Sequence, residues 1–163
     1  MQFARRGNDR RDLPFGALCD MGTLLTDFAE GGCLCGAVRY RVSGAPVATS
    51  RCHCNSCRRA SGAPSVAWVV VRTVDYAVVA GQLASFCSSP SVVRTFCGTC
   101  GTPLTYRHEE SPETIDITTA TFDFPGQFAP TREVWLEQRL AWEPVNDALQ
   151  HFPRSSMEPG AAG

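Results

Sequence analysis

The sequence has no long hydrophobic run and no excess of charge of one sign. Its longest uninterrupted apolar segment, VAWVVV at Val66–Val71, is far shorter than the roughly 20 residues that a membrane-spanning helix needs. Arginine and lysine together number 15, against 16 aspartates and glutamates. Because no basic field is available to neutralise phosphates, we do not expect nucleic acid as a partner, and the short apolar run gives no reason to expect a membrane.

The N-terminal segment also lacks the pattern of a secretion signal. MQFARRGNDRRDLPFGALCDMG contains arginines but no long apolar core before a small-residue cleavage site, so we expect a cytoplasmic protein. Residues 1–30 are charged and turn-rich without periodicity, which predicts a flexible extension. A chain of 163 residues is typical of one domain. We place that domain at residues 31–153, followed by a flexible tail at 154–163.

Cysteine is abundant instead, with nine in the chain. In a reducing compartment such cysteines are more often metal ligands or catalytic groups than disulfides. Seven of the nine lie in three tight clusters: CLC at 33–35, CHCNSC at 52–57 and CGTC at 97–100. The two isolated ones, Cys19 and Cys87, are interpreted as small apolar side chains.

The rest of the chain predicts short strands broken by turns. Alternating or β-branched segments supply the candidates: AVRYRV, SVAWVVV, YAVVAG, SVVRTF, PLTYR and TIDITTATF. SVAWVVV and YAVVAG are continuously apolar, which predicts core strands. Helix is expected only from Asn55 to about Ala60, with Asn55 as N-cap, and over Asn146–Phe152, with Asn146 as N-cap. The fold class is therefore mainly β, with short helical turns.

Two of the clusters together predict a closed metal site. Cys97 and Cys100 have the spacing of a zinc knuckle, and the glycines around them let both sulfurs turn toward one ion. A tetrahedral site needs a second pair of ligands, which Cys33 and Cys35 supply. Four thiolates fill the coordination sphere and leave no position for a substrate, so we predict a structural zinc site.

The middle cluster then keeps Cys52, Cys54 and Cys57 for a second ion. His53 is a possible fourth ligand, but in an extended segment it points away from the face that its two neighbours share. We therefore favour a packed histidine and a zinc ion with three thiolates and an open fourth position, the arrangement of catalytic zinc.

Charge indicates which chemistry suits such an ion. Zinc with three thiolates has a net negative charge and is a weak Lewis acid, so holding an incoming thiol as a thiolate suits it better than activating water. Arg58 and Arg59 follow Cys57 directly. They either offset that negative charge or bind a substrate carboxylate. The alternative is that they are solvated residues at the end of a helical turn.

Four motifs within about residues 31–145 resemble those of the glutathione-dependent formaldehyde-activating family. They are GGCLCGAVRY, CHCNSCRRASGA, SVVRTFCGTCGTPLTY and EVWLEQRLAW. The resemblance implies a β-tent, a zinc-ribbon-like antiparallel β fold shared with centromere protein V. It also implies two zinc ions per chain. The structural ion would be held by Cys33, Cys35, Cys97 and Cys100, and the catalytic ion by Cys52, Cys54 and Cys57.

The activity implied by this resemblance is that of a carbon–sulfur lyase. Its reference reaction joins glutathione and formaldehyde to S-hydroxymethylglutathione, so the expected partners are a small thiol and a small aldehyde. Two alternatives stay open: a non-catalytic binding module stapled by zinc, and an enzyme of the same fold that uses another thiol or aldehyde. A lyase needs an accessible middle site, whereas a staple needs that site closed by a fourth protein ligand.

Overall fold

The apolar segment in the middle of the sequence forms β4 (Val66–Arg72), an interior strand of an eight-stranded sheet. The computed structural model describes residues 28–156. Val69 and Val71 face one hydrophobic core, whereas Val66 and Trp68 face a second core on the opposite side. Because both faces of β4 are buried, its sequence needs no polar alternation.

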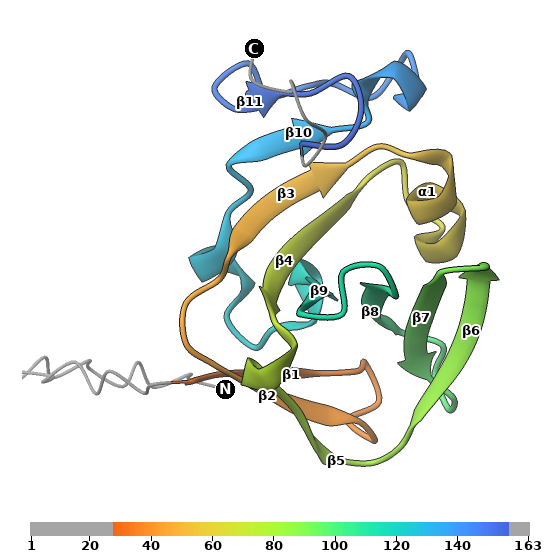
Figure 1. Ribbon diagram of the computed structural model, residues 1–163, viewed down its shortest axis with the longest axis vertical. Coiled ribbons are helices and arrows are strands. Elements are labelled where there is room, and N and C mark those ends of the chain that lie inside the picture. Colours follow the sequence, from red (N-terminus) through yellow and green to blue (C-terminus); the bar gives the residue numbers. More distant parts are fainter. Residues whose placement is uncertain (1–27, 157–163) are drawn as a thin grey trace, which may run out of the picture.

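The larger sheet has the strand order β11-β10-β3-β4-β9-β8-β7-β6. Its other strands are β3 (Ala48–Cys52), β6 (Leu83–Ser89), β7 (Val92–Cys97), β8 (Pro103–His108), β9 (Thr114–Thr118), β10 (Arg132–Val134) and β11 (Gln150–His151). Neighbouring strands are antiparallel, except that β10 runs parallel to both β3 and β11. The sheet curves around the molecule from β11 to β6 (Figure 1).

A second sheet contains β1 (Phe28–Gly32), β2 (Arg39–Ser43) and β5 (Tyr76–Ala80), in the order β1-β2-β5. Tyr40 of this sheet is fully buried in the core that also contains Val69 and Ile117 of the larger sheet. Gly31 allows this packing, because a Cβ atom there would lie 2.3 Å from the hydroxyl of Tyr40. The two sheets thus close around one core, as expected for the mainly β fold predicted from the sequence.

In the described part of the chain, residues 28–156, helical structure is limited to one short helix and four 3-10 turns. The helix α1 (Asn55–Ser61) connects β3 to β4 and ends at Gly62, whose φ of 66° is left-handed. The turns are η1 (Thr73–Asp75), η2 (Thr119–Thr121), η3 (Pro125–Phe128) and η4 (Leu136–Gln138). Within residues 28–156, no helix is long and apolar enough to cross a membrane.

The predicted helix over Asn146–Phe152 is wrong. The side chain of Asn146 does accept a backbone hydrogen bond, from the N–H of Ala148, but it forms a turn there instead of capping a helix. The N–H groups of Gln150 and Phe152 donate to Thr131 and Glu133. Because β10 offers unpaired backbone groups at its edge, the segment pairs with it as β11.

The prediction that YAVVAG is a core strand is also wrong. β5 lies at the edge of the smaller sheet, and its Val78 and Val79 are 39% and 50% exposed. β1 begins at Phe28, three residues before the expected start of the domain. The rest of the expected extension, including Cys19, and the last seven residues of the expected tail lie outside the described part of the chain.

Candidate functional site

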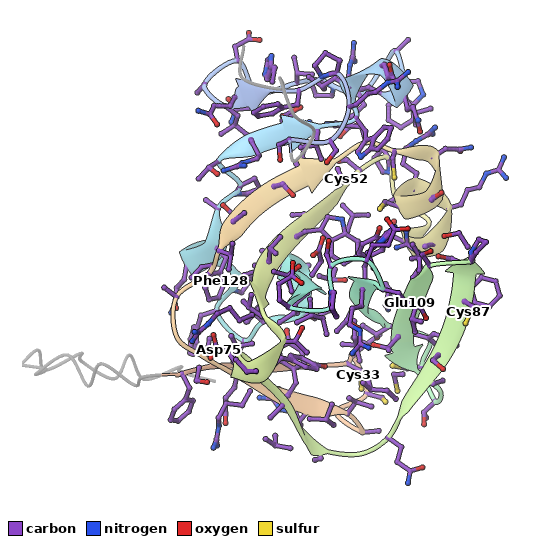
Figure 2. All side chains as sticks on the ribbon, in the orientation of Figure 1. Cys33, Cys52, Asp75, Cys87, Glu109 and Phe128 are labelled. Carbon is purple, nitrogen blue, oxygen red and sulfur yellow. The ribbon has the colours of Figure 1, made fainter. Side chains whose placement is uncertain are left out.

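Among the residues that the structure describes, two separate groups of cysteines lie close enough together to bind a metal ion. Cys52 lies between β3 and α1 in the upper half of the view, and Cys33 lies near the smaller sheet in the lower half (Figure 2). The sulfur atoms within each group are all within 4.8 Å of one another. We call them the four-cysteine cluster (Cys33, Cys35, Cys97 and Cys100) and the three-cysteine cluster (Cys52, Cys54 and Cys57).

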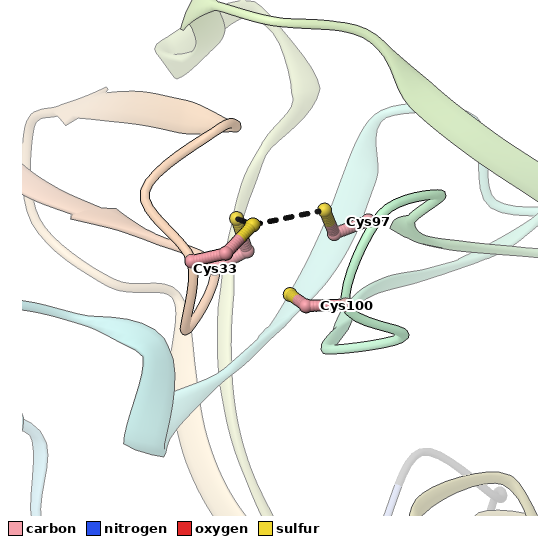
Figure 3. Close-up of side chains that lie close together, drawn as sticks. Cys33, Cys97 and Cys100 are labelled. Atoms are coloured by element: carbon pink, nitrogen blue, oxygen red, sulfur yellow. Dashed lines mark hydrogen bonds between the residues drawn. The ribbon is translucent and has the colours of Figure 1, made fainter.

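The four-cysteine cluster joins two segments that are distant in sequence (Figure 3). Cys33 and Cys35 lie in the loop between β1 and β2, whereas Cys97 ends β7 and Cys100 follows in the turn before β8. The Sγ of Cys35 is 3.5 Å from that of Cys33 and 3.8 Å from that of Cys97. A tetrahedral zinc ion with Zn–S bonds of about 2.3 Å separates its sulfur ligands by about 3.8 Å, so the cluster fits zinc.

Hydrogen bonds to two members of the four-cysteine cluster, Cys33 and Cys100, favour their thiolate forms. The Sγ of Cys33 accepts the N–H of Val38 at 3.2 Å, and the Sγ of Cys100 lies 3.1 Å from the hydroxyl of Thr102. Hydrogen bonds from Thr102 lower the pKa of Cys100 to about 5. Because the thiolate is the form that binds metal, these contacts prepare the cluster for an ion.

The three-cysteine cluster is built from the end of a strand and the start of a helix. Cys52 ends β3, Cys57 lies in the first turn of α1, and Cys54 is the N-cap, whose sulfur accepts the N–H of Cys57 at 3.3 Å. The sequence had predicted Asn55 as the cap, but Asn55 is the first helical residue. A sulfur atom therefore has the capping role that an oxygen usually has.

This cluster has one accessible edge. Cys52 and Cys57 are 5% and 6% exposed, whereas Cys54 is half-buried. Among residues 28–156, no fourth cysteine, histidine or carboxylate joins the group. Three thiols with one accessible member match the donor set expected for an ion with a free coordination position.

The three thiols differ in acidity because they lie against one another. Hydrogen bonds with Cys52 and then Cys57 lower the pKa of Cys54 to about 2. The interaction with Cys54 and then that with Cys57 raise the pKa of Cys52. The accessible thiol is therefore the first to become a thiolate, and a cation that binds there removes the protons of its neighbours.

One arginine that the sequence analysis missed contacts this cluster. The Nη2 of Arg94, on β7, lies 3.6 Å from the Sγ of Cys57, and its guanidinium lies 4.8 Å from the centroid of the Tyr106 ring. Arg94 is only 9% exposed, although it belongs to a strand whose buried positions are otherwise apolar. An arginine in such an alternating pattern is the signal that could have identified it.

The two arginines predicted near the cluster lie elsewhere. The Nε of Arg58 donates to the backbone carbonyl of His53 at 3.2 Å, and Arg59 is exposed. Arg94 is thus the arginine for which a contact with a thiol of the three-cysteine cluster is observed.

His53 is packed and does not belong to the three-cysteine cluster. Its Nε2 lies 2.9 Å from the Oε2 of Glu133 on β10, and both side chains are fully buried. Burial lowers the pKa of His53, and Glu133 opposes this effect. The other carboxylate oxygen of Glu133 accepts the N–H of Asn146 and lies 3.4 Å from the guanidinium of Arg51. This network joins the loop of the cluster to β10.

A second contact joins α1 to the segment that follows β10. The side-chain oxygen of Gln138, in η4, accepts the N–H of Asn55 at 2.8 Å. Between β10 and η4, Trp135 has a φ of 61°, which is rare outside glycine and marks local strain. Trp135 packs against the core that contains Cys52 and Cys57. The start of α1 is therefore held by two contacts, one from Glu133 to His53 and one from Gln138 to Asn55.

The family of this chain follows from comparison with known proteins. Residues 28–138 match the family model described as glutathione-dependent formaldehyde-activating enzyme. The chain belongs to this family. All seven clustered cysteines lie inside the matched residues. The family membership therefore covers both clusters and the strands that carry them.

One similar protein carries the name of this family, and one solved structure has a similar fold. A Halomonas elongata protein named "Putative glutathione-dependent formaldehyde-activating enzyme" is 28% identical, over 74% of this chain and 83% of its own length. A crystal structure of a Rhodobacter sphaeroides protein matches with a TM-score of 0.50 and 27% identity, over 58% of this chain and 87% of that protein. The mainly β fold is thus shared with a solved structure.

Proposed function

We propose that this member of the glutathione-dependent formaldehyde-activating family is a zinc-dependent carbon–sulfur lyase. Its reference reaction is the addition of glutathione to formaldehyde, giving S-hydroxymethylglutathione. The observation that carries the proposal is the difference between the two clusters. One offers four thiols, which suffice for a complete structural zinc site, and the other offers three thiols with an accessible edge at Cys54.

The charge of the three-cysteine cluster supports sulfur chemistry. A zinc ion held by Cys52, Cys54 and Cys57 would provide a soft position at which a thiol binds and loses its proton. Arg94 would balance the net negative charge of this arrangement, since it already donates to Cys57. With its charge balanced, the site would accept an additional thiolate without strong repulsion, and its three thiolates would still make the ion a weak Lewis acid toward water.

The surrounding side chains would restrict the site to a small adduct. Trp68 and Tyr106 lie on the same side as the cluster, with ring centroids 6.2 Å apart, and both pack with Cys52 and Cys57. They form an apolar wall, while Arg94 adds a fixed positive charge. An apolar wall with one fixed charge would strengthen the electrostatic interactions of the two buried thiols, while the edge at Cys54 stays accessible.

Cobalt substitution tests the proposal, because the visible spectrum of cobalt depends on the number of sulfur ligands. Adding glutathione should shift the bands of the three-cysteine cluster toward four-sulfur coordination, or release that ion to the competing thiol, while the bands of the four-cysteine cluster stay unchanged. Glutathione should also accelerate formaldehyde consumption above the rate without protein. Cys54→Ser should remove both effects, whereas the matched control Cys87→Ser, at an exposed position on β6, should keep them.

A spectrum that responds to another thiol but not to glutathione would favour an enzyme of the same fold with a different substrate. A spectrum indifferent to all small thiols would contradict the lyase proposal and favour a non-catalytic module.

A further inference from the structure

A row of side chains crosses the larger sheet next to the three-cysteine cluster. Arg94 on β7 pairs with Tyr106 on β8, Tyr106 pairs with Asp116 on β9, and Asp116 pairs with Val70 on β4. Residues directly opposite each other in antiparallel strands present their side chains to the same face. Tyr106 packs with Cys52 and Cys57 on this face, so Asp116 lies on the face of the cluster.

Asp116 is an unusual residue for this position. Its two neighbours along β9, Ile115 and Ile117, are buried in the core on the other face. The residue as a whole is partly buried, and within residues 28–156 its carboxyl forms no hydrogen bond or ion pair. Ionisation of a partly buried carboxyl without a partner destabilises the folded protein, so a structural role does not explain the presence of Asp116.

The environment of Asp116 keeps it protonated to unusually high pH. Burial raises the pKa of Asp116 to about 7, and the positive charge of Arg94 opposes this shift. Tyr106 stays neutral near this pH because burial, its largest influence, raises its own pKa to about 12. A carboxyl that titrates near neutrality can both accept and donate a proton there.

The other ionisable groups around this row are accounted for. Cys54 and Cys57 of the three-cysteine cluster lie on the α1 side and act on Tyr106 electrostatically. On β8, the Nδ1 of His108 accepts the N–H of Glu110. The charged residue of β4, Arg72, is paired with Asp75 at 2.7 Å. Arg94 is therefore the cation whose charge acts on Asp116.

We propose that Asp116 is the proton-transfer residue of the three-cysteine site, an assignment that rests on the proposed lyase function. Through one water beside Tyr106, Asp116 takes the proton as the S–H bond of the incoming thiol breaks. The sulfur then forms the C–S bond with the carbonyl carbon, and the π electrons of the carbonyl move to its oxygen. Asp116 returns the proton to this oxygen, so thiol and aldehyde give the hydroxyalkyl thioether without oxidation or reduction. In the cleavage direction the same carboxyl acts in reverse.

The first test compares Asp116→Asn with the matched control Asp147→Asn, which makes the same chemical change at an exposed position. In the zinc-loaded wild type, the rate with glutathione and formaldehyde should change with pH around 7. Asp116→Asn should lose this dependence and at least about 100-fold of the rate, the usual minimum for a positioned acid–base group. Its cobalt spectrum with glutathione should match that of the wild type. An Asp116→Asn variant with the wild-type rate and pH profile would overturn the role of Asp116 and leave the lyase proposal standing.

If the wild type shows no glutathione-dependent rate, the lyase proposal fails, and the role of Asp116 fails with it. The outcomes are therefore distinguishable.

A second test does not depend on activity. Because the pKa of Asp116 is raised in the folded state, the folded protein keeps a proton that the unfolded chain releases above about pH 4. This carboxyl therefore reduces stability progressively as pH rises from about 4 to 7. The melting temperature of Asp116→Asn, relative to wild type, should rise over that interval and then level off. A constant difference across the interval would overturn the assignment, because Asp116 would then titrate like an ordinary carboxyl.

Discussion

Replacing Cys97 with serine should unfold the protein, whereas Cys54→Ser should leave the fold intact. Cys97 is 1% exposed and lies at the end of β7, 3.8 Å from Cys35. Its substitution removes a ligand from the cluster that joins the β1–β2 loop to the larger sheet. Structural zinc sites contribute apparent binding free energies of about 10–16 kcal/mol that act as folding energy. This is comparable to the whole stability of a domain, about 5–15 kcal/mol.

Cys54→Ser should cost much less for two reasons. The sulfur of Cys54 caps α1 by accepting the N–H of Cys57, and serine is among the best N-cap residues, so the cap should change by less than about 1 kcal/mol. An ion in the three-cysteine cluster also links positions that are only five residues apart, whereas Cys35 and Cys97 are 62 residues apart. Chain entropy makes the longer link worth about 2 kcal/mol more.

The assay is thermal unfolding followed by circular dichroism, with soluble yield and zinc content measured for each variant. Cys97→Ser should give insoluble or melted protein, and Cys54→Ser should melt as a folded protein that has lost up to one ion. Cys87→Ser is the control, because Cys87 is exposed and belongs to neither cluster. Equal loss of stability in Cys97→Ser and Cys54→Ser would refute this reasoning and make the three-cysteine cluster a structural site.

Two further predictions concern the ions. Gently purified protein should contain between one and two zinc ions per chain. A mild chelator should first remove one of them, from the accessible three-cysteine cluster. A single ion that resists chelation until the protein unfolds would contradict the division into two sites. Arg94→Gln should weaken metal binding at the three-cysteine cluster about 10- to 100-fold, since a hydrogen bond to a charged group contributes about 1.5–3 kcal/mol. Competition with a chromophoric chelator measures the metal affinity. Arg94→Lys should recover part of that affinity. Unchanged affinity in Arg94→Gln would show that Arg94 does not stabilise the thiolates.

The sequence predicted which cysteines group together because the geometry of each pair is local. In C-x-C and C-x-x-C, two thiols are held within reach of one ion by a few backbone bonds, whatever the rest of the chain does. The pairing of Cys33 and Cys35 with Cys97 and Cys100 needed only the count of ligands around zinc. The structure brings these four sulfurs together.

The strand prediction is correct where the side-chain pattern determines burial, and it is wrong where the position of a strand at a sheet edge determines it. Val69 and Trp68 face opposite cores, so the apolar run of β4 is a direct consequence of burial on both faces. Val78 and Val79 have the same β-branched pattern in β5 but lie at a sheet edge, which no local pattern reveals. Asn146 likewise satisfies the local rule for a helix cap, and the free edge of β10 overrides it.

Long-range contacts between polar groups could not be predicted. Arg94 meets Cys57 across 37 residues, and Asp116 reaches the same face only through the register of β7, β8 and β9. That register depends on hairpin geometry and on irregular pairing between β7 and β8, which shifts the pairing after Thr95. An arginine and an aspartate in alternating strands indicate inward-facing polar groups, but not which cluster they meet.

The behaviour of His53 explains why the middle cluster has three ligands. The sequence places a histidine between Cys52 and Cys54, where it is a competing ligand for any ion that the thiols bind. In the structure, Glu133 holds its Nε2 at 2.9 Å in a fully buried pair. Release of the ring would leave a buried carboxylate with one partner fewer, at a cost of several kcal/mol. Glu133 therefore holds the histidine of the motif away from the thiols, as the proposed function requires, since that function needs a fourth position that no side chain of the motif fills.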